Sequence, residues 1–261
     1  MLWLTRSIFD HLDRANDTKP FKNPHRRLSI TVAMMALASL VAACGGDSSP
    51  DPAPDVDVDA LLTGAGEVMA AMSTARFSMV DELESGAKFF GTTFKRMETE
   101  VESPDSFRMV VDVEAPGFGF VEIEMMAVGE EAYLKLSADA PWNPLPLEQV
   151  PFNFSGLGFT LQDLLTTIKD GAVVAGRESL DGVQTIRVDG TLSSEQLSDL
   201  ISSVDPGHAV SLGLWIDETD HALKQIRIAG RIYNDDAPET VRLLTIEGID
   251  VSVDIELPDL G

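Results

Sequence analysis

Few side chains in this sequence have the chemistry for catalysis or metal binding, apart from its many carboxylates. After Cys44 there are two histidines, His208 and His221. Neither stands at a zinc-ligand spacing from cysteine, aspartate or glutamate, so no metal site is predicted. Ser155 lies in FSGLG, where Asn153 replaces the glycine that a nucleophile elbow needs two positions earlier. We therefore expect no catalytic residue, no cofactor and no enzymatic activity.

The carboxylates are too numerous to indicate a site. Residues 44–261 contain 40 aspartates and glutamates, so a pair suited to acid and base catalysis would arise by chance and a solvated face is the default. The spacing of Asp55, Asp57 and Asp59 matches the start of a calcium loop. Ala60 and Gly66 then occupy the positions where such a loop needs glycine and glutamate. We therefore interpret these aspartates as part of a solvated linker.

Net charge excludes one class of partner. The chain carries a formal charge of −24, and residues 44–261 hold 13 basic against 40 acidic residues. Nucleic acid would be repelled by such a surface, so no nucleic-acid binding is expected. Residues 1–43 have the opposite balance, with six Lys or Arg against three Asp. This asymmetry indicates that the two parts meet different environments.

The single cysteine, Cys44, ends an apolar stretch. A basic segment, KNPHRR, precedes LSITVAMMALASLVAA, an apolar run of 16 residues that ends in small ones. These are the parts of an export signal, and the run is shorter than the roughly 20 residues of a membrane span. Val41-Ala42-Ala43-Cys44 resembles the bacterial lipobox, which implies that Cys44 is lipidated and becomes the first mature residue. The alternative is an unpaired cysteine in an uncleaved signal anchor.

Composition divides the chain into three parts. Residues 1–43 are expected to be a lipoprotein signal peptide, residues 44–59 a flexible acidic linker, and residues 60–261 the folded domain. Two or three acyl chains on Cys44 would hold the protein durably at a bilayer. We expect a protein anchored by lipid to the extracytoplasmic face of the cell membrane.

Hydrophobic periodicity predicts the elements of the domain. Apolar residues spaced as on one helix face predict a helix of about 14 residues from Ala60, a second from Thr160 to Gly171 and a third from Ser193 to Pro206. Thr160 is expected to cap the second helix, and Ser193 with Gln196 to form a capping box in the third. Period-two alternation predicts a hairpin, FRMVVDVEA and VEIEMMAV, around a Pro-Gly turn. TIRVDGTL, AVSLGLWID, ALKQIRIAGRIY and SVDIELP alternate as further strands.

The order of these elements is similar to a known family. The Tyr133 strand, Trp142, LDGVQTIRVDGTL, LWID and ALKQIRIAG resemble the actinobacterial LppX/LprAFG lipoproteins over roughly Ala60 to Leu257. The resemblance implies an α+β fold: a strongly curved antiparallel β-sheet, a half-barrel, with helices covering its concave face as in the LolA/LolB carriers. It also implies an apolar cavity that holds the acyl chains of a lipid or glycolipid and carries them through the cell envelope. An envelope transporter would be a further partner.

The ligand residues follow from placing that cavity on the predicted elements. We expect it to be lined by Met109, Val111, Phe118, Phe120, Val121, Ile123, Met125, Leu164, Leu165 and Ile168. Each would serve equally well in an ordinary filled core. Phe118 and Phe120 follow a turn, so they stand at a cavity mouth or against a bilayer, or pack back into the core. The irregular segment 140–159 is a candidate lid, with Trp142, Phe152, Phe154 and Phe159 as its apolar contacts.

Two functions remain compatible with the sequence. The first is a membrane-anchored lipoprotein that binds and carries lipids. The second is a non-catalytic envelope lipoprotein with a filled core that engages a cell-wall or protein partner. An apolar pocket of about 300 Å³ or more would favour the carrier.

Overall fold

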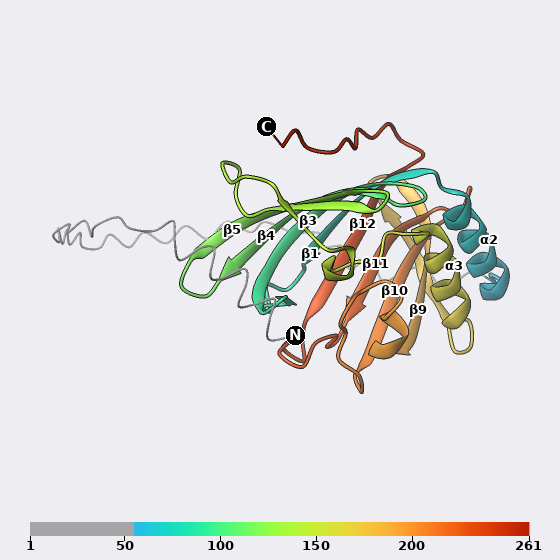
Figure 1. Ribbon diagram of the computed structural model, residues 1–261. Helices are drawn as coiled ribbons and strands as arrows, with labels where there is room; N and C mark the ends of the chain where they lie inside the picture. Colours follow the sequence, from blue (N-terminus) through green and yellow to red (C-terminus); the bar gives the residue numbers. More distant parts are fainter. Residues whose placement is uncertain (1–54, 261) are drawn as a thin grey trace, which may run out of the picture. The chain divides into compact units, whose positions relative to one another are not determined.

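One antiparallel sheet makes up most of the protein, for which the computed structural model describes residues 55–260 (Figure 1). Twelve strands form it within these residues: β1 Thr74–Asp81, β2 Lys88–Phe89, β3 Thr92–Glu102, β4 Ser106–Ala115, β5 Gly119–Val128, β6 Glu131–Lys135, β7 Asn143–Pro144, β8 Val173–Leu180, β9 Val183–Ser193, β10 Ala209–Asp217, β11 Leu223–Ala229 and β12 Val241–Ile249. Their spatial order is β7-β6-β5-β4-β3-β1-β12-β11-β10-β9-β8, with β2 beside β3. Pairing of β1 with β12 therefore joins an N-terminal and a C-terminal meander.

The predicted hairpin is confirmed as β4 and β5, which pair antiparallel with Met109 opposite Met125. The strands expected from TIRVDGTL and AVSLGLWID are β9 and β10, and these two also pair with each other. ALKQIRIAGRIY contains β11, which ends at Ala229 because the next residue, Gly230, has a φ of +120°. A left-handed residue of this kind turns the chain out of the extended conformation.

Two α-helices are present among residues 55–260, and both begin earlier than predicted. Helix α2 spans Val58–Ala71, and the side chain of Asp57 caps it by accepting a hydrogen bond from the amide of Ala60 at 3.1 Å. Helix α3 spans Leu157–Thr167 and follows Gly156, whose φ is +63°. The prediction of Thr160 as the cap is therefore wrong, because Thr160 already lies inside the first turn.

The third predicted helix is wrong in extent. Its capping box is present, with the amide of Ser193 donating to Gln196 at 2.8 Å, but only one 3₁₀ turn follows, η2 at Ser194–Leu197. The amide of Ile201 still donates to the Leu197 carbonyl, but the Leu200 carbonyl and the Ser202 amide are bonded to Asn153 and Pro151 across the bridge between Ile201 and Phe152. Backbone groups that are bonded to another segment cannot also continue a helical ladder.

The last predicted strand, SVDIELP, is wrong, because these residues form no strand and lie outside the sheet. Strand β12 ends at Ile249, and Asp250 then has a φ of +52°, which redirects the chain. The tail beyond it crosses the sheet face opposite the helices, where Arg76 donates to the Ser252 carbonyl at 2.7 Å (Figure 1). Alternation in the tail thus reflects packing on a surface and not pairing.

The helices pack together on one face of the sheet. α2 and α3 lie side by side (Figure 1), and a Cβ at Gly158 would lie 2.3 Å from the Met69 carbonyl oxygen. Only glycine permits that approach. α3 also rests on β9, where a Cβ at Gly190 would be 3.5 Å from Cβ of Ile168. The curved sheet with helices on its concave side confirms the predicted fold class.

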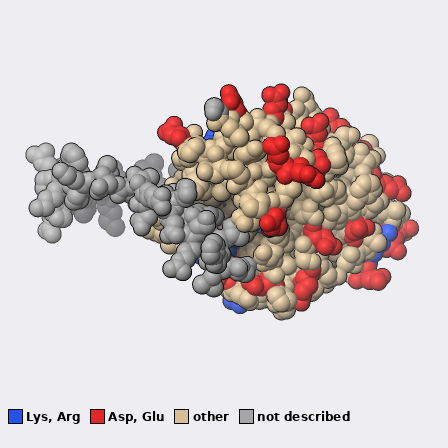
Figure 2. Space-filling view, in the orientation of Figure 1, with Lys and Arg blue, Asp and Glu red and all other residues tan. Residues whose placement is uncertain are grey.

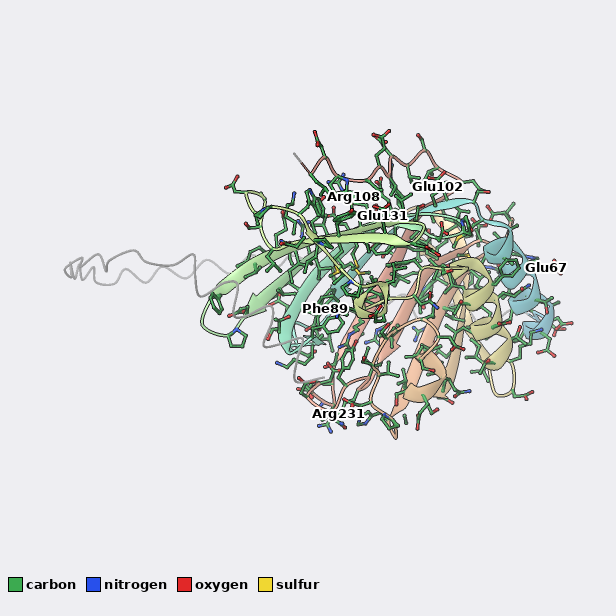
Figure 3. All side chains as sticks on the ribbon, viewed as in Figure 1. Glu67, Phe89, Glu102, Arg108, Glu131 and Arg231 are labelled. Carbon is green, nitrogen blue, oxygen red and sulfur yellow. The ribbon has the colours of Figure 1, made fainter. Side chains whose placement is uncertain are left out.

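The convex face of the sheet is built from charged residues. Cross-strand ion pairs join Arg76 to Glu100 and Arg108 to Glu124, each at 2.7 Å. Arg108 lies on the side of the sheet away from Phe89 (Figure 3). On the face turned to the viewer in Figure 2, acidic side chains are scattered and few basic ones are visible. Burial raises the pKa of Glu124, but hydrogen bonds from Lys135 and Arg108 outweigh it and hold that pKa below its ordinary value. This face is therefore held by paired charges.

Candidate ligand cavity

An apolar cavity of about 80 Å³ lies between the sheet and helix α3. Its walls come from the sheet, from α3, from the η2 region and from the segment that precedes α3. The lining residues are Phe77, Met97, Thr99, Leu212, Ile226, Ile228, Leu244, Leu157, Leu161, Leu164, Leu197, Leu200, Ile201, Phe152, Asn153 and Phe154. Fourteen of these side chains are hydrocarbon or thioether, so the space suits an acyl chain and not a charged group.

Residues 150–157, which we call the lid segment, form one wall of the cavity. The ring of Phe152 stacks on Phe89 with centroids 6.2 Å apart and lies 5.9 Å from Phe154. Phe154 in turn contacts Phe107 of β4 at 4.6 Å. These rings close the space between the β2–β4 end of the sheet and helix α3.

Hydrogen bonds tie the lid segment mainly to the connection between β9 and β10. The amide of Asn153 donates to the Leu200 carbonyl at 3.0 Å, and the amide of Ser202 donates to the Pro151 carbonyl at 2.8 Å. The Ser202 hydroxyl also donates to the Val150 carbonyl at 3.0 Å. Two segments about 50 residues apart in sequence thus form one covering layer.

Of the ten residues expected to line a cavity, Leu164 is on its wall. The others pack beside it or stand away from it. Met109, Val111, Ile123 and Met125 are buried on β4 and β5, and Leu165 and Ile168 are buried at α3. Val121 is half-buried, Phe118 is half-buried in the β4–β5 turn, and Phe120 is 66% exposed. Contact of these nine with a ligand stays a prediction.

The four candidate lid residues also fall into two groups, two that line the cavity and two that lie away from it. Phe152 and Phe154 line the cavity as expected. Trp142 instead lies near β6, with the Lys135 ammonium 4.7 Å from its ring centroid, and Phe159 is 64% exposed at the start of α3. The aromatic composition of segment 140–159 indicated a lid, but it could not distinguish the aromatic residues that line the cavity from those that do not.

Sequence reasoning missed the sheet wall formed by β1, β3 and β12. Phe77 and Met97 alternate with polar residues on β1 and β3, so period two could have placed them on the inner face. Alternation cannot tell a cavity wall from a filled core, because both present apolar side chains to the interior. The cavity depends on how side chains from distant strands meet.

Of the residues considered for catalysis or metal binding, the two histidines lie apart from the cavity wall, whereas Ser155 is part of the lid segment but not among the lining residues. Nε2 of His208 is 3.1 Å from Oδ1 of Asn234, whereas His221 packs against α2 at Gly64. The Ser155 amide donates to the Asn153 side chain at 3.1 Å. Within residues 55–260 no group of three or more His, Cys, Asp or Glu is placed to hold a metal ion.

Cys44 and residues 1–43 lie outside the described residues, so their lipidation and processing stay predictions. Residues 55–59 of the expected linker are described, and Val58 and Asp59 begin helix α2. None of the helices in the described part of the chain has the length and hydrophobicity needed to cross a bilayer.

Comparison with known proteins agrees with this architecture. Residues 87–260 match the model of the LppX_LprAFG lipoprotein family. Lipoarabinomannan carrier protein LprG of Mycobacterium tuberculosis is 24% identical over 207 residues, which are 78% of this chain and 85% of that protein. LprG of Mycolicibacterium smegmatis is 22% identical over 205 residues, 77% of this chain and 85% of that protein.

A solved structure shares the fold. The crystal structure of LprF from Mycobacterium bovis superposes with a TM-score of 0.58 at 15% identity, covering 81% of this chain and 98% of LprF. Taken with the family match over most of the described residues, this likeness shows that this chain belongs to the LppX_LprAFG family of carrier lipoproteins.

Proposed function

We propose that this protein binds the acyl chains of a lipid or lipoglycan between its sheet and helix α3 and carries them through the cell envelope. The observation that carries the proposal is the apolar cavity inside a half-barrel of this family. The relatives that are named for lipoarabinomannan support a lipoglycan as one ligand class. Binding would be driven by burial of hydrocarbon, at about 25 cal/mol per Å² of apolar area.

The cavity must enlarge to hold such a ligand. Its volume of about 80 Å³ is smaller than the roughly 300 Å³ at which small-molecule pockets begin. The lid segment is the part that can yield, because Phe152, Phe154 and Leu157 are only half-buried and its backbone bonds run mainly to the η2–β10 connection. Displacing three aromatic or aliphatic side chains from the wall would open the space to the surface.

Anchoring at a membrane completes the proposal. Cys44 would carry the acyl chains that hold the domain at the extracytoplasmic face of the cell membrane, and residues 45–54 would separate the domain from the bilayer. Metabolic labelling with a palmitate analogue should mark the wild-type chain and not Cys44→Ser. A transporter of the envelope stays a predicted partner.

The small volume of the cavity favours a second function. A core that stays closed would make this a non-catalytic envelope lipoprotein that engages a cell-wall or protein partner. The convex face, with its cross-strand pairs of charged residues, would then be the surface that binds the partner. The two functions differ in whether lipid enters the concave side.

Two neighbouring leucines of β12 provide the test. Leu244 lines the cavity, whereas Leu243, the next residue on the same strand, points to the convex face. An indole ring at residue 244 would occupy the cavity, and the same ring at 243 would lie on the outer surface. We expect Leu244→Trp to lose bound lipid while Leu243→Trp keeps it, measured by native mass spectrometry of protein purified from membranes.

The outcomes separate the two functions. Lipid bound to the wild type and to Leu243→Trp, and absent from Leu244→Trp, supports the carrier. A wild-type chain that carries no lipid, and that binds none when offered diacyl lipids in vesicles, would overturn it in favour of the filled core. Circular dichroism melting of both variants checks that each is folded.

A further inference from the structure

One hydroxyl group in the cavity wall has no hydrogen-bond partner among the described residues. Thr99, in the middle of β3, is 3% exposed, and its Oγ1 is buried without a donor or acceptor. It lies opposite Phe77 of β1 and Met109 of β4 and between Met97 and Val101 along its own strand. These four neighbours are all buried and apolar.

Such a group is costly to the folded protein. A buried hydroxyl without a partner destabilises a protein, whereas valine has nearly the same shape without that penalty. Val101, Val111 and Val113 occupy comparable inner positions on β3 and β4. The hydroxyl at residue 99 is therefore not explained by packing.

We infer that the Thr99 hydroxyl is a hydrogen-bond donor to the ester carbonyl of the bound lipid, which specifies an esterified acyl lipid as the ligand class. This inference rests on the proposed function, since it needs lipid in the cavity. Thr99 faces the same space as Leu161 and Leu164 of α3 and Phe154 of the lid segment. A chain lying there places its hydrocarbon against these residues and its carbonyl within reach of Oγ1.

The lack of charge in the cavity lining limits the class of ligand further. The other polar residue of the wall, Asn153, is exposed on the lid segment, so Thr99 is the inner polar position and Asn153 the outer one. Among the described residues no Lys, Arg or His lines the cavity, so an ionised carboxylate of a free fatty acid would have no counter-ion next to Thr99. A neutral ester carbonyl accepts one hydrogen bond from the hydroxyl and needs no counter-ion.

The inference is tested by changing two things in combination: the linkage of the lipid, ester or ether, and the side chain at residue 99. The probes are dipalmitoyl phosphatidylglycerol and its dihexadecyl ether analogue, which lacks both carbonyl oxygens. The proteins are the full-length wild type, Thr99→Val, which removes the hydroxyl, and Thr99→Ser, which keeps it, each purified from membranes and delipidated. Dissociation constants come from titrating each delipidated protein with each of the two lipids, followed by native mass spectrometry.

We expect the preference for ester over ether to fall by about threefold to tenfold in Thr99→Val and to persist in Thr99→Ser. Thr99→Val without ligand should melt at a higher temperature than the wild type, because the unpaired hydroxyl is gone. The same ester preference in all three proteins would overturn the inference and leave the carrier intact. Lack of binding of either probe to the wild type would instead count against the proposed function.

Discussion

The two faces of the sheet satisfy their polar groups in opposite ways. On the convex face, charged side chains reach across neighbouring strands, as Lys95 of β3 does to Glu114 of β4 at 3.2 Å and Arg76 of β1 does to Glu100 of β3 at 2.7 Å. On the concave face nearly every side chain is apolar, and the Thr99 hydroxyl has no partner in the described residues. These charges of the convex face are paired within the fold, although Asp112 Oδ1 has no partner among the described residues, whereas the concave face leaves space and hydrogen-bonding capacity for something else.

Strength of pairing also differs between the faces. The ion pair on the inner side of β12, Arg242 with Asp236 at 2.7 Å, has side chains only 4% and 0% exposed. Lys95 and Glu114 on the convex face are 44% and 59% exposed. Solvent screens exposed pairs, and it cannot compensate a buried charge that loses its partner. The comparison therefore predicts a wide spread in the cost of removing a charge.

The largest effect is expected from Asp236→Ala. Its carboxylate accepts from the Arg242 guanidinium and from the amides of Lys88, Ile232 and Tyr233, at 2.7–3.0 Å. Removing it leaves a buried cation and three amides without their acceptor, so we expect a loss of about 3–5 kcal/mol in the free energy of unfolding. Urea denaturation followed by circular dichroism measures this.

The neighbouring Asp235 is the matched control for that variant, because it is exposed. Asp235→Ala should change the free energy of unfolding by less than about 0.5 kcal/mol. Equal denaturation midpoints for the two alanine variants would show that the buried cluster contributes no more than a surface charge.

A pH titration gives the next largest effect, at the same buried cluster. Burial raises the pKa of Tyr233 to about 12, although the Arg242 guanidinium, 5.6 Å from its ring, acts in the opposite direction. The folded state thus favours the neutral phenol. Its contribution is fully present below the unfolded pKa of about 10 and is lost between pH 10 and 12, by about 2–3 kcal/mol.

Ultraviolet absorbance isolates this titration. The chain has two tyrosines, so Tyr133→Phe leaves Tyr233 as the only phenol. We expect its phenolate to appear in the folded protein near pH 12, and we expect Tyr233→Phe to lose less stability than the wild type between pH 10 and 12. A phenolate that forms near pH 10 in the folded Tyr133→Phe variant would contradict the prediction.

The smallest effect belongs to the convex face. Lys95→Ala removes one exposed cross-strand pair, so we expect the free energy of unfolding to fall by less than about 0.5 kcal/mol, and by still less in high salt. A double-mutant cycle with Glu114→Ala measures the coupling between the two side chains. A coupling above about 1 kcal/mol would remove the contrast between the two faces.

Local sequence patterns predicted the parts of the fold that depend on near neighbours. The β4–β5 hairpin follows from alternation on both sides of Pro116-Gly117, and the capping box of Ser193 and Gln196 forms as expected. Strand β12 was not predicted, because VRLLTIEGI places Leu243 beside Leu244 and buries Arg242, so its alternation is blurred. Its place beside β1 is a long-range pairing that periodicity cannot show.

The candidate site was less predictable than the fold for the same reason. Phe152 and Phe154 were expected from the composition of a long irregular segment, and Leu164 from a helical stripe. Thr99 carries no signal in the sequence, because a threonine on a strand usually finds solvent or a partner. Its isolation arises only from the tertiary contacts of three strands and a helix.

The bonds between the lid segment and Leu200–Ser202 have a kinetic consequence. Because the Asn153 and Ser202 amides each donate across the same junction, neither segment can leave the cavity without breaking bonds of the other. Opening is then a single event, and these two amides should exchange their protons with water at a common rate. In such a carrier, the residence time of the bound lipid is set by the rate at which the lid segment and residues 200–202 open together, whatever the length of the acyl chain.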